Sequence, residues 1–95
     1  MSATYGAVHN HHEQAVFDAV NAGALAYPDL ANKNLLTDVA CVALNRIAPK
    51  YIRHDVDFSF YLSNTERSDN ERLIAEAVTF AFEFVQARNA MRARA

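Results

Sequence analysis

The chain has 95 residues, 52% of them hydrophobic and 21% charged, a balance typical of a single globular domain that excludes a disordered segment. Its formal net charge of −2 gives no basic field that would attract long nucleic acids. Because neither a signal pattern nor a membrane-spanning apolar run is present, we expect a cytoplasmic protein that does not bind membranes. The single cysteine, Cys41, excludes an internal disulfide and is interpreted as a small packing residue in a helix.

The first predicted helix begins near Asn10, after an N-terminal tail of residues 1–8. Asn10 and Glu13 form an N-x-x-E pattern that is typical of a helix N-terminus. The apolar residues that follow at helical spacing are Val16, Phe17, Val20, Ala24 and Tyr27. We expect the helix to end at Tyr27-Pro28-Asp29, because proline cannot continue it.

A second helix is predicted from Leu35 to Ala48. It is apolar on nearly every face, so we expect it to be the central and most buried element. Asp38 and Asn45 lie one heptad apart on it, and their simplest role is to satisfy backbone groups around the next turn. Pro49 ends this helix, and a short basic segment follows. That segment contains Lys50, Tyr51, Arg53 and His54.

The third segment, Arg53 to Ser63, changes from helical to alternating spacing. Its apolar residues are Val56, Phe58, Phe60 and Leu62, and polar residues or Tyr61 separate them. This alternation is typical of a half-buried strand. Because the rest of the chain looks helical, such a strand would pair with its copy in a second subunit. The alternative is an extended loop that lies on the helices.

A third helix is predicted from Ser68 to about Met91, beginning with the capping box Ser68-x-x-Glu71. Its apolar residues cover an arc of roughly 200°, about twice the stripe that one core requires. The excess predicts a second apolar contact, with another subunit, although the sequence does not show which side of the helix faces that subunit. The arginines after it are interpreted as a solvated tail, with residues 92–95 frayed. They are Arg88, Arg92 and Arg94.

The sequence therefore predicts a mainly α protein. Three principal helices and one short extended segment form a compact single domain over residues 1–95, and two copies form a homodimer.

The sequence contains no pattern for metal binding or catalysis. Its histidines flank a predicted helix start and lack the Cys or H-E-x-x-H framework of a zinc site, so no metal is expected. They are His9, His11, His12 and His54. A glycine-rich phosphate loop, a nucleophile elbow and a carboxylate pair at a defined spacing are also missing, so we expect the protein to bind rather than to catalyse.

The basic segment is the best candidate site. Arginine stacks on purines and binds phosphate, tyrosine also stacks, and Asp57 can accept hydrogen bonds from a guanine edge. Two copies beside a two-fold axis would suit a two-fold ligand. In the alternative interpretation, Arg53 pairs with Asp55 or Asp57 and Tyr51 packs against the second helix.

The chain resembles the ComFB family, the late competence development proteins of bacteria. The matching residues are N-x-x-E-x-x-V from Asn10 to Val16, then Tyr27-Pro28, then D-V-A-x-x-A-L-N-R-x-x-P-K-Y from Asp38 to Tyr51. They cover residues 8–52, and the second half matches only in general character. Family members often carry a Cys-x-x-Cys pair where this chain has Asn32 and Leu35, so a metal role of that pair does not apply here.

The resemblance implies a small helical homodimer with a non-enzymatic, regulatory role in competence or motility. It also implies binding of a cyclic dinucleotide, cyclic di-GMP in particular, near the dimer interface and without a cofactor. Asn45 would hold the turn, so that Tyr51 and Arg53 contact the ligand. The neighbouring candidates are Lys50, His54 and Asp57.

The rival hypothesis is an adaptor that binds another protein through its last helix or its free strand edge, without a small ligand. The sequence identifies neither the downstream partner nor the outcome of competition with cyclic di-AMP.

Overall fold

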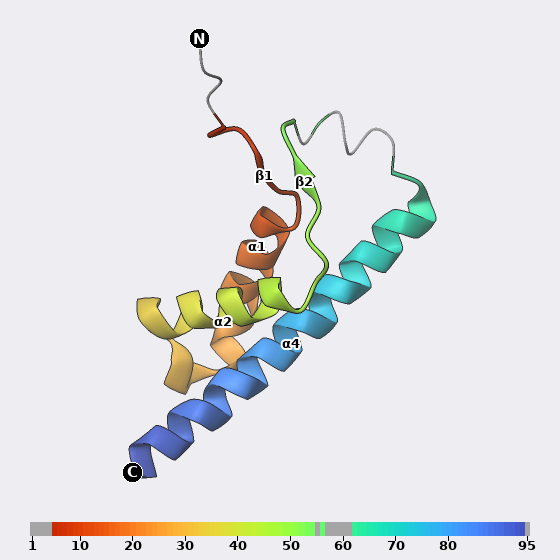
Figure 1. Ribbon diagram of the computed structural model, residues 1–95. Helices are drawn as coiled ribbons and strands as arrows, with labels where there is room; N and C mark the ends of the chain where they lie inside the picture. Colours follow the sequence, from red (N-terminus) through yellow and green to blue (C-terminus); the bar gives the residue numbers. More distant parts are fainter. Residues whose placement is uncertain (1–4, 55, 57–61, 95) are drawn as a thin grey trace.

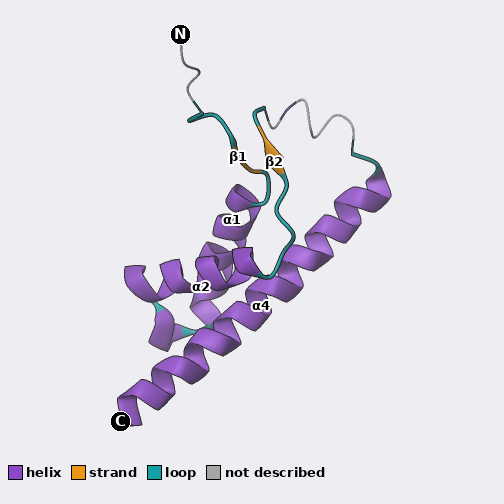
Figure 2. Cartoon of the chain, in the orientation of Figure 1, coloured by secondary structure: helices purple, strands orange, loops and turns teal. Residues whose placement is uncertain are grey.

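The computed structural model describes residues 5–54, 56 and 62–94, and within them the chain is mainly helical (Figures 1 and 2). The elements are β1 (His9–Asn10), α1 (Glu13–Gly23), the 3₁₀ helices η1 (Ala24–Ala26) and η2 (Pro28–Leu30), α2 (Lys33–Asn45), β2 (Tyr51–Ile52) and α4 (Asn64–Arg94). Three principal helices and one short sheet form a single compact domain, which confirms the predicted fold class. The homodimer stays a prediction.

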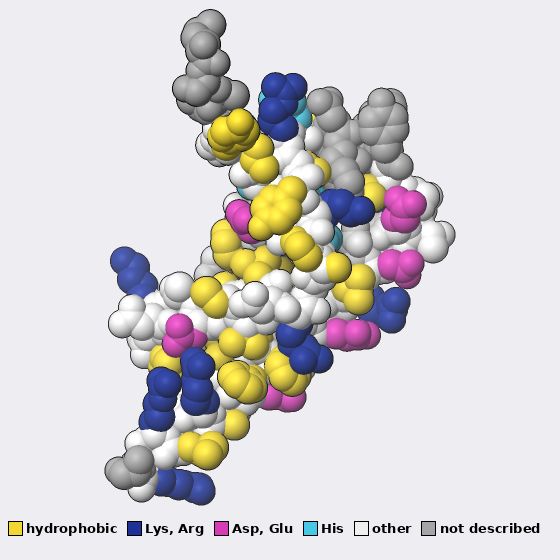
Figure 3. Space-filling view, viewed as in Figure 1, with side chains coloured by type: hydrophobic (Ala, Val, Ile, Leu, Met, Phe, Trp, Pro, Cys, Tyr) yellow, Lys and Arg dark blue, Asp and Glu magenta, His cyan; other side chains and the backbone are white. Residues whose placement is uncertain are grey.

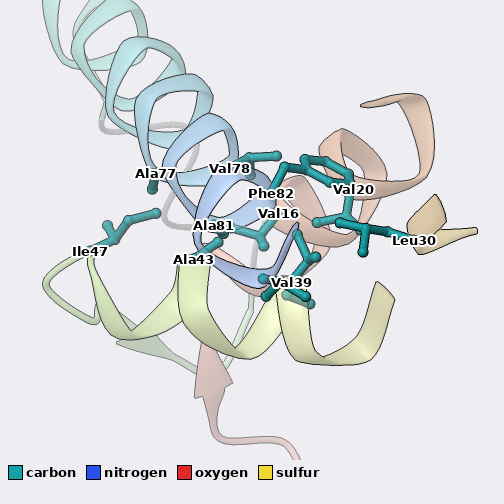
Figure 4. Packing of buried hydrophobic residues seen from close by; sticks show 12 residues of the cluster. Val16, Val20, Leu30, Val39, Ala43, Ile47, Ala77, Val78, Ala81 and Phe82 are labelled. Atoms are coloured by element: carbon teal, nitrogen blue, oxygen red, sulfur yellow. The ribbon is translucent and has the colours of Figure 1, made fainter. Parts of the chain in front are cut away.

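The hydrophobic core lies where α1 and α2 pack against the middle of α4 (Figure 1). Figure 4 shows side chains from all three helices pointing toward one another. The buried members are Val16, Val20, Leu30, Val39, Ala40, Ala43, Ile47, Ala77, Val78, Ala81, Phe82 and Val85. Three of the 13 residues of α2 are buried, against five of the 31 residues of α4 and two of the 11 residues of α1. For its length α2 is therefore the most buried helix, as its apolar sequence predicted.

Phe82 anchors this core. Its side chain is 1% exposed and its ring stacks on that of Tyr27, with the ring centroids 4.5 Å apart. Gly23 lies against the same ring, where a Cβ atom would be only 2.8 Å from Cε2 of Phe82. Glycine is thus needed for the close approach of α1 and α4. Phe82 therefore belongs to the core of its own chain.

The N-terminal half differs from prediction at its helix ends. The helix α1 begins at Glu13 rather than near Asn10, because Asn10 is part of β1. It ends at Gly23, and the two 3₁₀ helices carry the chain to α2. The side chain of Asn32 caps α2 by accepting a hydrogen bond from the backbone N–H of Leu35 at 2.9 Å. Cys41 is exposed, so its predicted packing role is wrong.

A short strand pair that the sequence did not predict joins the start of the chain to the segment after α2. The strands β1 and β2 are antiparallel, with His9 opposite Ile52 and Asn10 opposite Tyr51. Two residues in each strand are too few to produce a visible alternation in the sequence. Most of the strand predicted over 53–63, residues 55 and 57–61, lies outside the described residues.

The capping box of the long helix α4 (Asn64–Arg94) lies five residues before the predicted one. The N–H of Glu66 donates to Oγ of Ser63 at 3.1 Å, and the N–H of Ser63 donates to Oε2 of Glu66 at 3.4 Å. The capping box is therefore Ser63-x-x-Glu66, and Ser68 lies inside the helix. The helix continues to Arg94, through most of the tail expected to fray. A search of the described residues found no helix able to cross a membrane.

Candidate ligand-binding site

The basic segment after α2 is held by the strand pair, and we call residues 9–12 with 49–54 the platform. The backbone N–H of His11 donates to the carbonyl oxygen of Lys50 at 2.6 Å. Oδ1 of Asn10 accepts two further hydrogen bonds, from the N–H of Lys50 at 3.1 Å and from the N–H of His12 at 3.2 Å. The segment from Pro49 onward is therefore fixed to the start of α1, although the two lie about 40 residues apart in sequence.

Asn10 is the residue that holds the turn. Its side chain is 7% exposed, and its own N–H donates to Oε2 of Glu13 at 3.3 Å. The sequence assigned this role to Asn45, whose exposed amide instead donates to the carbonyl oxygen of Cys41 one helical turn back. That prediction is wrong. The N-x-x-E pattern identified Asn10 only as a local helix cap and gave no sign of its bond to Lys50.

The platform gathers four of the six predicted site residues. Lys50, Tyr51, Arg53 and His54 are consecutive or nearly so, and all four are exposed. Tyr51 is 66% exposed, so the alternative in which it packs against the second helix is wrong. Asn45 lies apart from them, at the end of α2, and Asp57 lies outside the described residues. An aromatic face beside cationic side chains can stack on a base and contact a phosphate.

The other polar residue of the α2 motif, Asp38, joins α2 to α4. Its Oδ2 accepts from Nη2 of Arg88 at 3.4 Å in a partly exposed ion pair. The guanidinium of Arg88 also lies 5.7 Å from the centre of the Phe84 ring. Asp38 therefore does not satisfy backbone groups around the turn, and Arg88 does not belong to a solvated tail. Both expectations are wrong.

An exposed row of large apolar side chains follows α4 beside its core-facing side, and we call it the α4 stripe. It consists of Leu73 (44% exposed), Phe80 (37%), Phe84 (45%) and Met91 (71%). The guanidinium of Arg46 lies 3.7 Å from the centre of the Phe80 ring. Figure 3 shows apolar side chains beside basic ones along α4. As the wide apolar arc predicted, α4 has two apolar sides.

The donors needed for a metal site do not gather in the part of the chain that the structure describes. Within it, no group of three or more His, Cys, Asp or Glu side chains could hold a metal ion.

Comparison with known proteins identifies one family. Residues 9–89 match the model of the family described as late competence development protein ComFB. Neither the curated proteins nor the solved structures contain a match to the chain. The family match includes β1, β2 and most of α4, and so extends well beyond the motifs noted in the first half of the sequence.

Proposed function

We propose, starting from the fact that the chain belongs to the ComFB family, that it is a regulatory protein that binds cyclic di-GMP and has no catalytic activity. Binding occurs on the platform of a homodimer. The dimer has two conformational states, and the ligand binds one of them more tightly. Binding therefore shifts the population of the dimer toward that state, or changes which downstream protein the dimer binds.

The exposed side chains of the platform, on an anchored backbone, carry this proposal. Tyr51 offers an aromatic face for a guanine, while Lys50 and Arg53 supply positive charge for the two phosphates. Since Asn10 and His11 already fix the backbone beneath them, little additional ordering is required when the ligand binds.

The α4 stripe supports the homodimer in this proposal. Apolar residues at this spacing suit the seam between two packed helices. If two copies of α4 pair in parallel about a two-fold axis, both platforms lie at the same end of the dimer, because the platform lies toward the beginning of α4 (Figure 1). That arrangement suits a ligand that is itself two-fold.

Calorimetric titration with cyclic di-GMP tests the proposal, with cyclic di-AMP and GTP as comparison ligands. We expect micromolar or tighter binding of cyclic di-GMP, near one ligand or one intercalated pair per dimer. Loss of a charged hydrogen-bond partner in Arg53→Ala should weaken binding about tenfold or more, without changing the oligomeric state. The matched control is Arg72→Ala, since Arg72 is an exposed arginine on α4 that contacts only nearby carboxylates.

Two results would contradict this function. One is the absence of heat together with an unchanged melting temperature at high ligand concentration. The other is equal binding by Arg53→Ala and the wild type. Either would favour the adaptor hypothesis, which the exposed α4 stripe also supports as a docking surface for another protein.

A further inference from the structure

A cavity of about 340 Å³ lies between the N-terminal parts of α1 and α4. Residues on its α1 side include His12, Gln14 and Ala15, and residues on its α4 side include Asn70, Glu71 and Ile74. Its volume is at the lower end of the range for small-molecule pockets, roughly 300–1,000 Å³. Polar and apolar groups thus meet in a space of the size that one small ring system requires.

His12 is the most informative residue of this cavity. The residue is 6% exposed and its imidazole forms no hydrogen bond with another described residue, but its nitrogens are not sealed from solvent. Burial, followed by the nearby charges of His11 and Lys50, lowers the pKa of His12 below its ordinary value of 6.5. The ring is therefore neutral near pH 7, with one nitrogen as a donor and the other as an acceptor. The ring therefore keeps a donor and an acceptor at the cavity wall that a ligand can engage in place of water.

The remaining polar groups favour a neutral, hydrogen-bonding ligand over an anion. Glu71 forms no ion pair or hydrogen bond with another described residue, and Asp18 accepts from Nε2 of Gln14 at 3.0 Å. The negative charges of these two carboxylates repel a phosphate group, even though Arg67 also lines the cavity. Donors, acceptors and the apolar side chains of Ala15 and Ile74 together suit a flat heterocycle with a mixed donor and acceptor edge.

We infer that this cavity binds a guanine base, and that Glu71 is its specificity-determining residue. A carboxylate can accept two hydrogen bonds, from N1–H and from the exocyclic amino group of guanine, and adenine does not present this pair of donors. The inference rests on the proposed function, because the guanine is that of the cyclic dinucleotide. His11 connects the two sites: it lines the cavity, and its N–H bonds to Lys50 in the platform.

The test compares the binding of cyclic di-GMP and cyclic di-AMP by the wild type and by Glu71→Gln. Glutamine has nearly the same shape but cannot accept both hydrogen bonds. We expect cyclic di-GMP to bind about ten- to a hundredfold more weakly and cyclic di-AMP to be unaffected, so that the preference for guanine is lost. The matched control, Glu76→Gln, changes a carboxylate of the same helix that pairs with Arg72 outside the cavity.

A second variant tests the cavity without changing any charge. Ala15→Leu adds bulk at an exposed helical position on the cavity wall and should also weaken cyclic di-GMP binding about tenfold or more. If the wild type binds cyclic di-GMP and both variants match it within twofold, the guanine site is disproved while the receptor function stands. If the wild type binds neither dinucleotide, both the function and the guanine site are disproved.

Discussion

Asn10 joins three segments of the chain through one buried side chain, so its removal should affect the whole platform. In Asn10→Ala, the N–H groups of Lys50 and His12 lose their shared acceptor. We expect the free energy of unfolding to fall by about 2 kcal/mol in chemical denaturation, because buried donors without partners cost about 1–3 kcal/mol. Asn10→Asp, which keeps the acceptor oxygen, is the control. A loss below about 0.5 kcal/mol in Asn10→Ala would show that water replaces the amide.

Single residues also show where the sequence was informative about the site. The exposed cluster of Lys50, Tyr51, Arg53 and His54 was predictable, because a basic segment directly after a helix-ending proline lies on the surface. The role of Asn10 was not predictable, since its partner Lys50 is distant in sequence and a local pattern carries no information about it. The cavity was missed for the same reason, because its two walls come from residues 11–18 and 62–74, which are distant in sequence.

At the scale of elements, the position of the first turn of α4 can be tested directly. Ser63→Ala removes the hydroxyl that accepts from the N–H of Glu66, and should lower the free energy of unfolding by about 1 kcal/mol. Ser68→Ala should be neutral or slightly stabilising, because alanine is the better helix former at an exposed internal position. Denaturant unfolding of both variants measures the difference. If Ser68→Ala lowered the free energy of unfolding more than Ser63→Ala, Ser68 and not Ser63 would be the residue that caps the helix.

The two capping boxes show why helix ends were harder to predict than helices. Ser63-x-x-Glu66 and Ser68-x-x-Glu71 have the same local pattern, so the sequence alone does not rank them. Once a helix is nucleated, each further residue adds a hydrogen bond at little cost, and the helix therefore extends to the earlier box. The helices themselves were predictable, because several turns of apolar periodicity average out local exceptions.

At the scale of the whole molecule, burial separates the apolar arc of α4 into two faces that the sequence showed as one. Phe82 is buried in the core of its own chain, whereas Phe80 and Phe84 are partly exposed in the α4 stripe. These residues lie within four positions of one another, so periodicity alone does not separate the two faces. A single chain therefore covers only part of the apolar surface of α4, and a second copy can cover the rest.

Phe84→Glu is the variant that tests this assembly. Because Phe84 is 45% exposed, a charge there should leave the fold of one chain intact, but it would lose hydration without a partner inside an apolar interface. Light scattering after size exclusion should give about twice the chain mass of 10.6 kDa for the wild type and about 10.6 kDa for Phe84→Glu, with unchanged circular dichroism. Gln86→Glu adds the same charge to an exposed position off the stripe and should stay dimeric. A monomeric wild type, or a dimeric Phe84→Glu, would exclude the α4 stripe as the homodimer interface.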